Sequence, residues 1–289
     1  MLLLTWESAD KVVRKDIIKP GIFSKTATEC ARCNIIIENI EVDNRSTQDK
    51  NEKLNSNVLD GLNEKSLIIG EADNEIDRQI ERALQMMLVL EKSLITIRVP
   101  SEDIDKHSII KAQITMNHIE PHKPIWEWTP EEKYQIASRY KETGVQLFKE
   151  QRWVDAFYRF SKACKILITL EPIADLELDK KLENDINNLR LQLYNNMAGC
   201  HLKRKNYEYT VSLCTKVLDK EINNVKALYR RGVAYGNLKN IERAFLDLRN
   251  AFNLEPHNPT IKQQYLIYDA KCQEANKKCD DMIRRMFKA

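Results

Sequence analysis

Residues 228–256, LYRRGVAYGNLKNIERAFLDLRNAFNLEP, decide the fold of the C-terminal half of this chain. Small residues stand at Gly232, Ala244 and Ala251, and large apolar residues recur around them at helical spacing. Small side chains at such positions allow two helices to cross closely, because a large side chain there would force the helices apart. The stretch therefore predicts a tightly packed pair of helices.

Two earlier stretches repeat this pattern, one around Gly144 and one around Ala198. Ala198 precedes Gly232 by 34 residues, which is the period of the tetratricopeptide (TPR) repeat, a pair of helices. Gly144 precedes Ala198 by 54 residues, a spacing about 20 residues longer than one repeat. We therefore expect two lengthened helices between them, Val154–Glu177 and Lys180–Lys203.

These copies predict three TPR repeats over residues 123–258, although Thr210 stands in the second copy where alanine is usual. Residues 129–132 (TPEE) have the capping-box pattern that begins a helix. Three helix pairs leave an apolar face at the end of the stack, so we expect a C-terminal capping helix over residues 259–289. Its apolar residues recur at helical spacing: Ile261, Tyr265, Tyr268, Cys272, Ala275, Cys279, Met282 and Met286.

The first 122 residues have a different pattern, made of short β-branched and alternating segments. Three segments are typical of strands: residues 33–40, 94–99 and 109–119. Residues 74–87 have the apolar spacing of one amphipathic helix, and residues 43–66 are polar and predict a mobile loop. We therefore predict an α+β chain of two domains, with a β domain over residues 1–122 followed by an all-α TPR solenoid.

Composition narrows the function classes. The chain has 289 residues but only 7 glycines and 8 prolines, and it contains neither common glycine-rich nucleotide-binding motif. No apolar run approaches the roughly 20 residues of a membrane helix. The 7 cysteines are scattered over a long chain, as is typical of reduced thiols. We expect an intracellular protein, cytoplasmic and able to enter the nucleus, without a metal or other cofactor.

The charge is distributed unevenly along the chain. The first 125 residues carry a net charge of −4, and the remaining residues carry +7. The second half should therefore prefer an acidic partner. We expect that partner to be a protein, and neither nucleic acid nor a membrane.

Beyond the repeat period, the sequence resembles one protein family. Trp126–Glu150, Asn195–Lys203 and Lys226–Gly232 are similar to the junction, the second repeat and the third repeat of FKBP-type immunophilins that carry a TPR domain. Ser66–Glu71 and Ala83–Ser93 are a fainter match to the FKBP domain itself. The resemblance implies that an FKBP-like domain precedes the TPR solenoid.

The FKBP-like half departs from the family at its proline-binding pocket. In the family this pocket is an aromatic cage with a tryptophan at its floor, and that position falls here at Gln79-Ile80. Residues 1–125 contain no tyrosine, and their only phenylalanine is Phe23. These residues cannot build an aromatic cage, so we expect a degenerate domain without prolyl isomerase activity. Divergent FKBP-like co-chaperones that lack a working isomerase site look most similar.

The TPR half matches the family's carboxylate clamp at four of five positions. This clamp binds the acidic C-terminal tail, Glu-Glu-Val-Asp, of heat shock protein 90 or 70. The resemblance places it at Lys141, Asn196, Lys226 and Arg230, whereas Val145 replaces the remaining asparagine. One lost hydrogen bond to a charged group costs about 1.5–3 kcal/mol, so we expect weakened binding. Taken singly, such residues are more often solvated side chains on a helix face.

Other interpretations stay open at this point. The chain could be a prolyl isomerase with an unusual pocket, or a germline small-RNA-pathway co-chaperone of the same architecture, and its client is unknown. Cys30 and Cys33 could form a redox pair or half of a zinc site, although two ordinary cysteines are the simpler interpretation. The glycosylation pattern at Asn44 is interpreted as coincidence. The basic last helix either caps the solenoid or binds calmodulin or another acidic surface.

Overall fold

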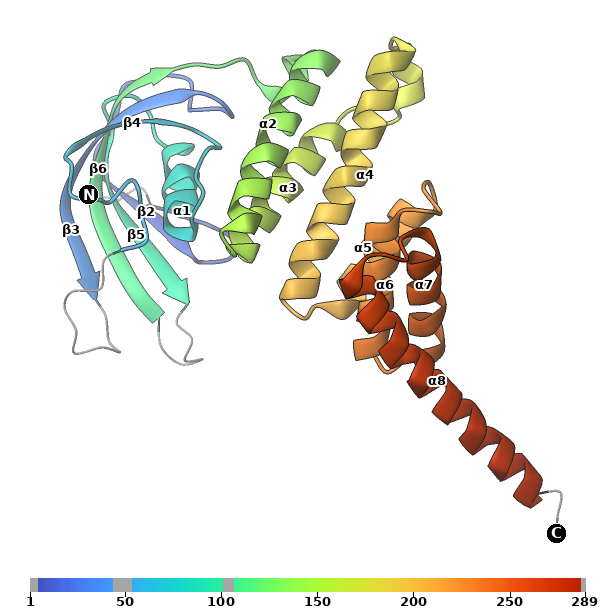
Figure 1. Cartoon of the computed structure of the whole chain (residues 1–289). Coiled ribbons are helices and arrows are strands. Elements are labelled where there is room, and N and C mark those ends of the chain that lie inside the picture. The colour runs from blue at the N-terminus through green and yellow to red at the C-terminus, as the bar shows by residue number, and fades with distance from the viewer. Residues whose placement is uncertain (1–4, 44–53, 101–106, 287–289) are drawn as a thin grey trace. The chain divides into compact units, whose positions relative to one another are not determined.

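The structure is a computed structural model that describes residues 5–43, 54–100 and 107–286 (Figure 1). The chain forms two compact units, Met1–Trp128 and Thr129–Ala289. The first unit contains the strands and the second contains the long helices.

The first unit is built on a six-stranded antiparallel sheet in the order β1-β2-β5-β6-β3-β4. Its strands are β1 (Thr5–Glu7), β2 (Val13–Lys19), β3 (Arg32–Asp43), β4 (Glu64–Ile68), β5 (Lys92–Pro100) and β6 (His107–Glu120). One helix, α1 (Glu75–Leu84), lies against the concave face of the curved sheet (Figure 1). The three predicted strands and the predicted helix are confirmed.

The core of this unit lies between α1 and the sheet. On β3, Cys33, Ile35 and Ile37 are buried at alternate positions, because successive side chains of a strand point to opposite faces. On α1, the buried residues include Ile76, Ile80, Ala83 and Leu84. Apolar side chains spaced three or four apart give this helix one face for the core.

The predicted polar loop over residues 43–66 is wrong at its C-terminal end. Strand β4 begins at Glu64, and Val58 and Leu59 are buried in the core of the unit. Asp77 on α1 holds the segment in place, because its carboxylate accepts hydrogen bonds from the Ser56 hydroxyl and from the backbone amides of residues 57 and 58. Residues 44–53, including the pattern at Asn44, lie outside the described residues.

The second unit consists of helices that follow one another in pairs. They are α2 (Pro130–Lys149), α3 (Trp153–Ile168), α4 (Lys180–Lys203), α5 (Tyr207–Leu218), α6 (Val225–Asn237), α7 (Ile241–Leu254) and α8 (Pro259–Met286). The capping box at the start of α2 is confirmed: the Glu132 amide donates to the Thr129 hydroxyl, and the Thr129 amide donates to the Glu132 carboxylate.

One predicted helix boundary is wrong and another is confirmed. The helix predicted over Val154–Glu177 ends as α3 at Ile168, and a short 3-10 helix, Ile173–Leu176, follows it. Pro172 explains the early end, because proline lacks the amide hydrogen and clashes with the preceding turn of a helix. Helix α4 has the predicted bounds, Lys180–Lys203.

Small residues mark the crossings of paired helices, as the sequence predicts. A Cβ atom on Gly144 would lie 2.6 Å from the Phe160 ring, and one on Gly232 would lie 2.8 Å from Leu248 Cγ. Thr210, the unusual residue of the second repeat, is fully buried, and its hydroxyl donates to the Asn206 carbonyl at 3.0 Å. The hydroxyl is therefore satisfied within its own helix.

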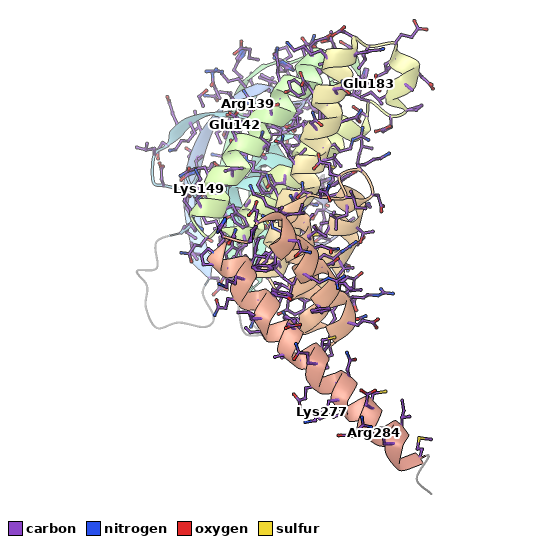
Figure 2. The ribbon with its side chains drawn as sticks, turned by 45° about the vertical axis from the view of Figure 1, so that its right-hand side comes forward. Arg139, Glu142, Lys149, Glu183, Lys277 and Arg284 are labelled. Carbon is purple, nitrogen blue, oxygen red and sulfur yellow. The ribbon has the colours of Figure 1, made fainter. Side chains whose placement is uncertain are left out.

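Helix α8 caps the last pair only with its first half. Ile261 and Tyr268 are buried, and the Tyr265 ring stacks on Phe252 with centroids 4.9 Å apart. In contrast, every side chain over residues 273–284 is exposed, so the predicted capping helix covers the stack with its first half only. The helix is longer than the helices beside it, and Figure 2 shows Lys277 and Arg284 on its projecting end. No helix in the described residues is both long and apolar enough to span a membrane.

Candidate functional site

Three helices of the second unit lie next to one another and carry all the predicted clamp residues. They are α2, α4 and α6, the first members of the successive pairs, and α4 contacts both α2 and α6. The predicted residues come from all three helices, with Lys141 on α2, Asn196 on α4, and Lys226 and Arg230 on α6.

Lys141 reaches across from α2 to α4. Its Nζ atom donates a hydrogen bond to Gln192 Oε1 at 3.0 Å. Gln192 lies one helical turn before Asn196, so the two side chains share a face of α4. Lys141 is therefore held next to the part of α4 that carries the predicted Asn196.

Arg230 reaches α4 from the other side. Its Nη1 atom donates to the Asn195 carbonyl at 2.6 Å and also to Asn195 Oδ1. Burial of the guanidinium lowers the pKa of Arg230, although an arginine keeps its charge in proteins. The structure thus brings Lys141 and Arg230 to neighbouring residues of one helix.

Two further positions, Lys226 and Val145, differ in whether their side chains can donate a hydrogen bond. Lys226 is exposed one turn before Arg230, and it forms no ion pair or hydrogen bond with any residue that the structure describes. Val145 is half-buried one turn after Lys141 and has no side-chain donor. The predicted positions therefore contribute three cationic groups, on Lys141, Lys226 and Arg230, and one amide, on Asn196.

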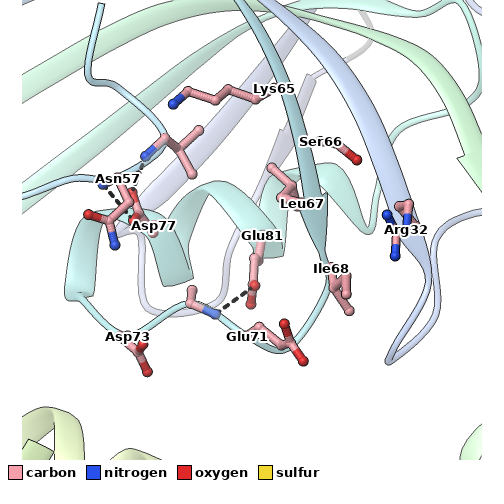
Figure 3. Close-up of a pocket in the computed structure, with 12 residues that line it drawn as sticks. Arg32, Asn57, Lys65, Ser66, Leu67, Ile68, Glu71, Asp73, Asp77 and Glu81 are labelled. Atoms are coloured by element: carbon pink, nitrogen blue, oxygen red, sulfur yellow. Dashed lines mark hydrogen bonds between the residues drawn. The ribbon is translucent and has the colours of Figure 1, made fainter. Parts of the chain in front are cut away.

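The first unit has a pocket of about 400 Å³ beside α1 and β4 (Figure 3). Its lining mixes apolar and polar side chains and includes four carboxylates, Glu71, Asp73, Asp77 and Glu81, together with Arg32 and Lys65. None of the described residues that line it is aromatic. Asp77 is occupied in holding residues 56–58, and Glu81 accepts from the Ala72 amide at 2.9 Å.

The position expected at the floor of an aromatic cage is filled by aliphatic packing. Ile80 is 1% exposed within a core whose buried members are all aliphatic or sulfur-containing. Gln79 is buried too, and it bonds to Glu75 and Arg82 on its own helix. Trp6 is the one aromatic residue packed against this core among those described, and it is only partly buried.

Family models match both units. Residues 6–121 match the model described as BDBT FKBP like N-terminal, and residues 129–212 match the model described as Bride of doubletime-like, TPR domain. The chain belongs to the FKBP-like proteins that carry a TPR domain. Its FKBP-like domain is the first unit and its TPR domain is the second.

Known proteins of this kind are similar over most of the chain. Human peptidyl-prolyl cis-trans isomerase FKBP4 is 28% identical over 76% of this chain and 46% of its own length, and Drosophila melanogaster FK506-binding protein 59 is 29% identical over 72% and 47%. The chain thus spans about half the length of these curated relatives. A crystal structure of residues 1–211 of CG17282 matches 71% of this chain and 96% of its own, with 23% identity and a TM-score of 0.57.

Sequence reasoning missed three residues of the candidate site in the TPR domain. Gln192 orients Lys141, Asn195 holds Arg230, and Gly199 lies directly under the Arg230 guanidinium. The sequence signal was present, because Asn195 is a polar residue on the buried side of α4 and Gly199 interrupts a helix. Their partner on α6, however, lies more than 30 residues away in the chain.

The cysteines of the FKBP-like domain do not form a reactive pair. Neither Cys30 nor Cys33 forms a disulfide, and burial raises the pKa of Cys33 to about 12. A thiol with that pKa is a weak nucleophile near neutral pH, because only the thiolate reacts. Within the described ranges, no three His, Cys, Asp or Glu side chains are grouped so as to hold a metal ion.

Proposed function

We propose that this protein is a non-enzymatic cytoplasmic co-chaperone that binds the acidic C-terminal tail of heat shock protein 90, or of heat shock protein 70. Lys141, Asn196, Lys226 and Arg230 form the binding site, and the FKBP-like domain contacts a client. The observation that carries this proposal is the meeting of Lys141 and Arg230 at α4, beside Asn196, on three neighbouring first helices of TPR pairs.

The chemistry of the tail suits these residues. A chain that ends in Asp presents two carboxylates, one from the side chain and one from the terminus. Charge-assisted hydrogen bonds to ammonium and guanidinium groups are roughly twice as strong as neutral ones. The net positive charge of residues 126–289 would also attract an acidic peptide. Val145 supplies no donor, so binding is expected to be weaker than with a full set of donors.

We also propose that the FKBP-like domain has no prolyl isomerase activity. The aliphatic core around Ile80 and the four carboxylates that line the pocket support this, because a proline ring is bound by apolar and aromatic surface. Relatives of the chain are named as isomerases, so activity is measured directly. With a proline-containing tetrapeptide, the full chain should leave the isomerisation rate at its uncatalysed value, and a clear acceleration would overturn this part of the proposal.

Peptide binding is tested by fluorescence polarisation with a labelled peptide that ends in Glu-Glu-Val-Asp. The wild-type chain should bind in the micromolar range, and Lys226→Ala combined with Arg230→Ala should abolish binding. A matched control, Lys165→Ala combined with Lys239→Ala, removes two exposed charges outside the first helices and should bind as the wild type does. Absence of wild-type binding at high micromolar concentration would refute the proposal, as would full binding by the first double variant.

A further inference from the structure

We propose that Asn195 and Gly199 are positioning residues that hold the Arg230 guanidinium in place and leave its Nε–Nη2 edge to receive a peptide carboxylate. This inference rests on the carboxylate site proposed above and extends it to two residues of α4. Arg230 would then be a preset receptor group and not a mobile surface side chain.

The first step concerns the anchored end of the guanidinium. Nη1 carries two hydrogens, and it has two acceptors on Asn195: the backbone carbonyl at 2.6 Å and the side-chain Oδ1. Both hydrogens of Nη1 are therefore used by a single residue. Two bonds from one nitrogen fix both the position and the rotation of a planar group.

Asn195 is itself held firmly. It is 7% exposed, and its Nδ2 atom donates to Asn224 Oδ1 at 3.1 Å. Asn224 is the N-cap of α6, and its Oδ1 atom also accepts from the Ala227 amide at 3.0 Å. The support for Arg230 thus runs from α4 to the fixed start of the helix that carries Arg230.

Gly199 provides the surface on which the guanidinium lies. A Cβ atom at this position would stand 3.2 Å from both Cζ and Nη2 of Arg230, and 3.4 Å from Nε. These distances place the plane of the guanidinium close against the backbone of α4. Glycine inside a helix costs about 1 kcal/mol relative to alanine, and close approach of a side chain is one reason to keep it.

The opposite edge of the guanidinium stays available. Arg230 is half-buried, and its Nε and Nη2 atoms donate no hydrogen bond to any residue in the described part of the chain. Together they present two parallel donors, which is the geometry that binds a carboxylate through both oxygens. Because the side chain is already ordered, the peptide would not bear the entropy cost of immobilising it.

The test is a double-mutant cycle on the full chain, with the same labelled peptide. Asn195→Leu removes Oδ1 at similar size, and it should weaken binding about 3- to 10-fold. Arg230→Lys keeps the charge but lacks the fork, so adding Asn195→Leu to it should cause no further loss. Gly199→Ala should weaken binding in the same direction as Asn195→Leu. An equal loss from Asn195→Leu in both backgrounds would mean a merely structural role and would overturn the inference.

A second readout is independent of the peptide. In a ¹⁵N spectrum, the Nε–H signal that disappears in Arg230→Lys belongs to Arg230, and its hydrogen exchange should accelerate in Asn195→Leu. If the wild type binds no peptide, the proposed function fails, and the inference is then decided by this signal alone. Unchanged exchange in Asn195→Leu would show that Asn195 does not position Arg230.

Discussion

Replacing Gly236 with alanine should release α8 from the TPR domain. Gly236 lies on α6, and a Cβ atom there would overlap the Tyr268 hydroxyl and ring. Tyr268 is 7% exposed and packs against Ala244 and Leu248 of α7. Because a Cβ atom would overlap the end of a ring that is packed against these side chains, we expect the ring to leave its site.

The size of the effect follows from two opposing terms. Expelling a buried aromatic side chain costs about 3–5 kcal/mol, judged from the truncation of such residues. Alanine in place of glycine inside a helix returns about 1 kcal/mol. The docking of α8 should therefore weaken by about 2–4 kcal/mol, while the pairing of α6 with α7 through Gly232 is left intact.

Amide hydrogen exchange measures this directly. In Gly236→Ala, the amides of residues 261–268 should exchange about 30- to 1,000-fold faster, as expected from 2–4 kcal/mol. The side chains of residues 273–284 are exposed, so the exchange of these amides should not change. Tyr268→Ala provides the control, because adding Gly236→Ala to it should stabilise the protein slightly. Unchanged exchange at 261–268 in the single variant would refute the reasoning.

Three further predictions concern other parts of the molecule. Lys15→Met should lower the free energy of unfolding by about 3–5 kcal/mol in a urea titration, because it leaves the Glu91 carboxylate buried without its cation. Glu91 is 2% exposed, and its carboxylate lies 2.6 Å from Lys15 Nζ. A loss below 1 kcal/mol would contradict this prediction. Asp77→Ala should lower the free energy of unfolding by about 1–3 kcal/mol and should accelerate amide exchange over residues 54–59. Exchange that changes uniformly across the domain would contradict the role of Asp77 as a local anchor. Burial raises the pKa of the thiols of Cys33, Cys200 and Cys214 to about 12. A thiol reagent at pH 8 should therefore modify exposed Cys279 in the folded chain, but should modify these three thiols only after the chain unfolds. Stability should also fall as the pH rises above about 9, because the unfolded chain then releases thiol protons that the folded chain keeps, and a flat pH profile from 9 to 11 would contradict the burial of these thiols.

The parts of the fold that the sequence predicted well depend on local patterns. Gly232 and its counterpart Gly144 mark helix crossings, and Thr129 marks a helix start through contacts with near neighbours in the chain. Two of the errors arise where contacts between distant parts of the chain decide the structure. Val58 belongs to the core because Asp77, on a later helix, holds its segment. The distal half of α8 has the apolar period of a packed helix, but periodicity does not reveal whether a partner helix is long enough to cover it.

In the candidate site, too, contacts between distant parts of the chain decide what the sequence alone did not predict. The charged residues were predicted at Lys141, Lys226 and Arg230 because a resemblance supplied their positions. Their orientation depends on α4, where Asn195 and Gln192 accept hydrogen bonds from two different helices. Such cross-helix partners have no fixed spacing in the sequence, so they become visible only when the helices are assembled.

The two domains differ in how tightly their residues are constrained. The FKBP-like domain is held by aliphatic side chains between α1 and the sheet, so its stability does not require aromatic rings around a pocket. A substitution of the half-buried pocket residues Glu71 or Asp73 would change the pocket surface but leave this core in place. In the TPR domain, Gly144 and Gly232 cannot accept a Cβ atom unless Phe160 or Leu248 moves. Binding surfaces on the first domain can therefore change at little cost in stability, whereas the helix crossings that orient α2, α4 and α6 leave little room for substitution.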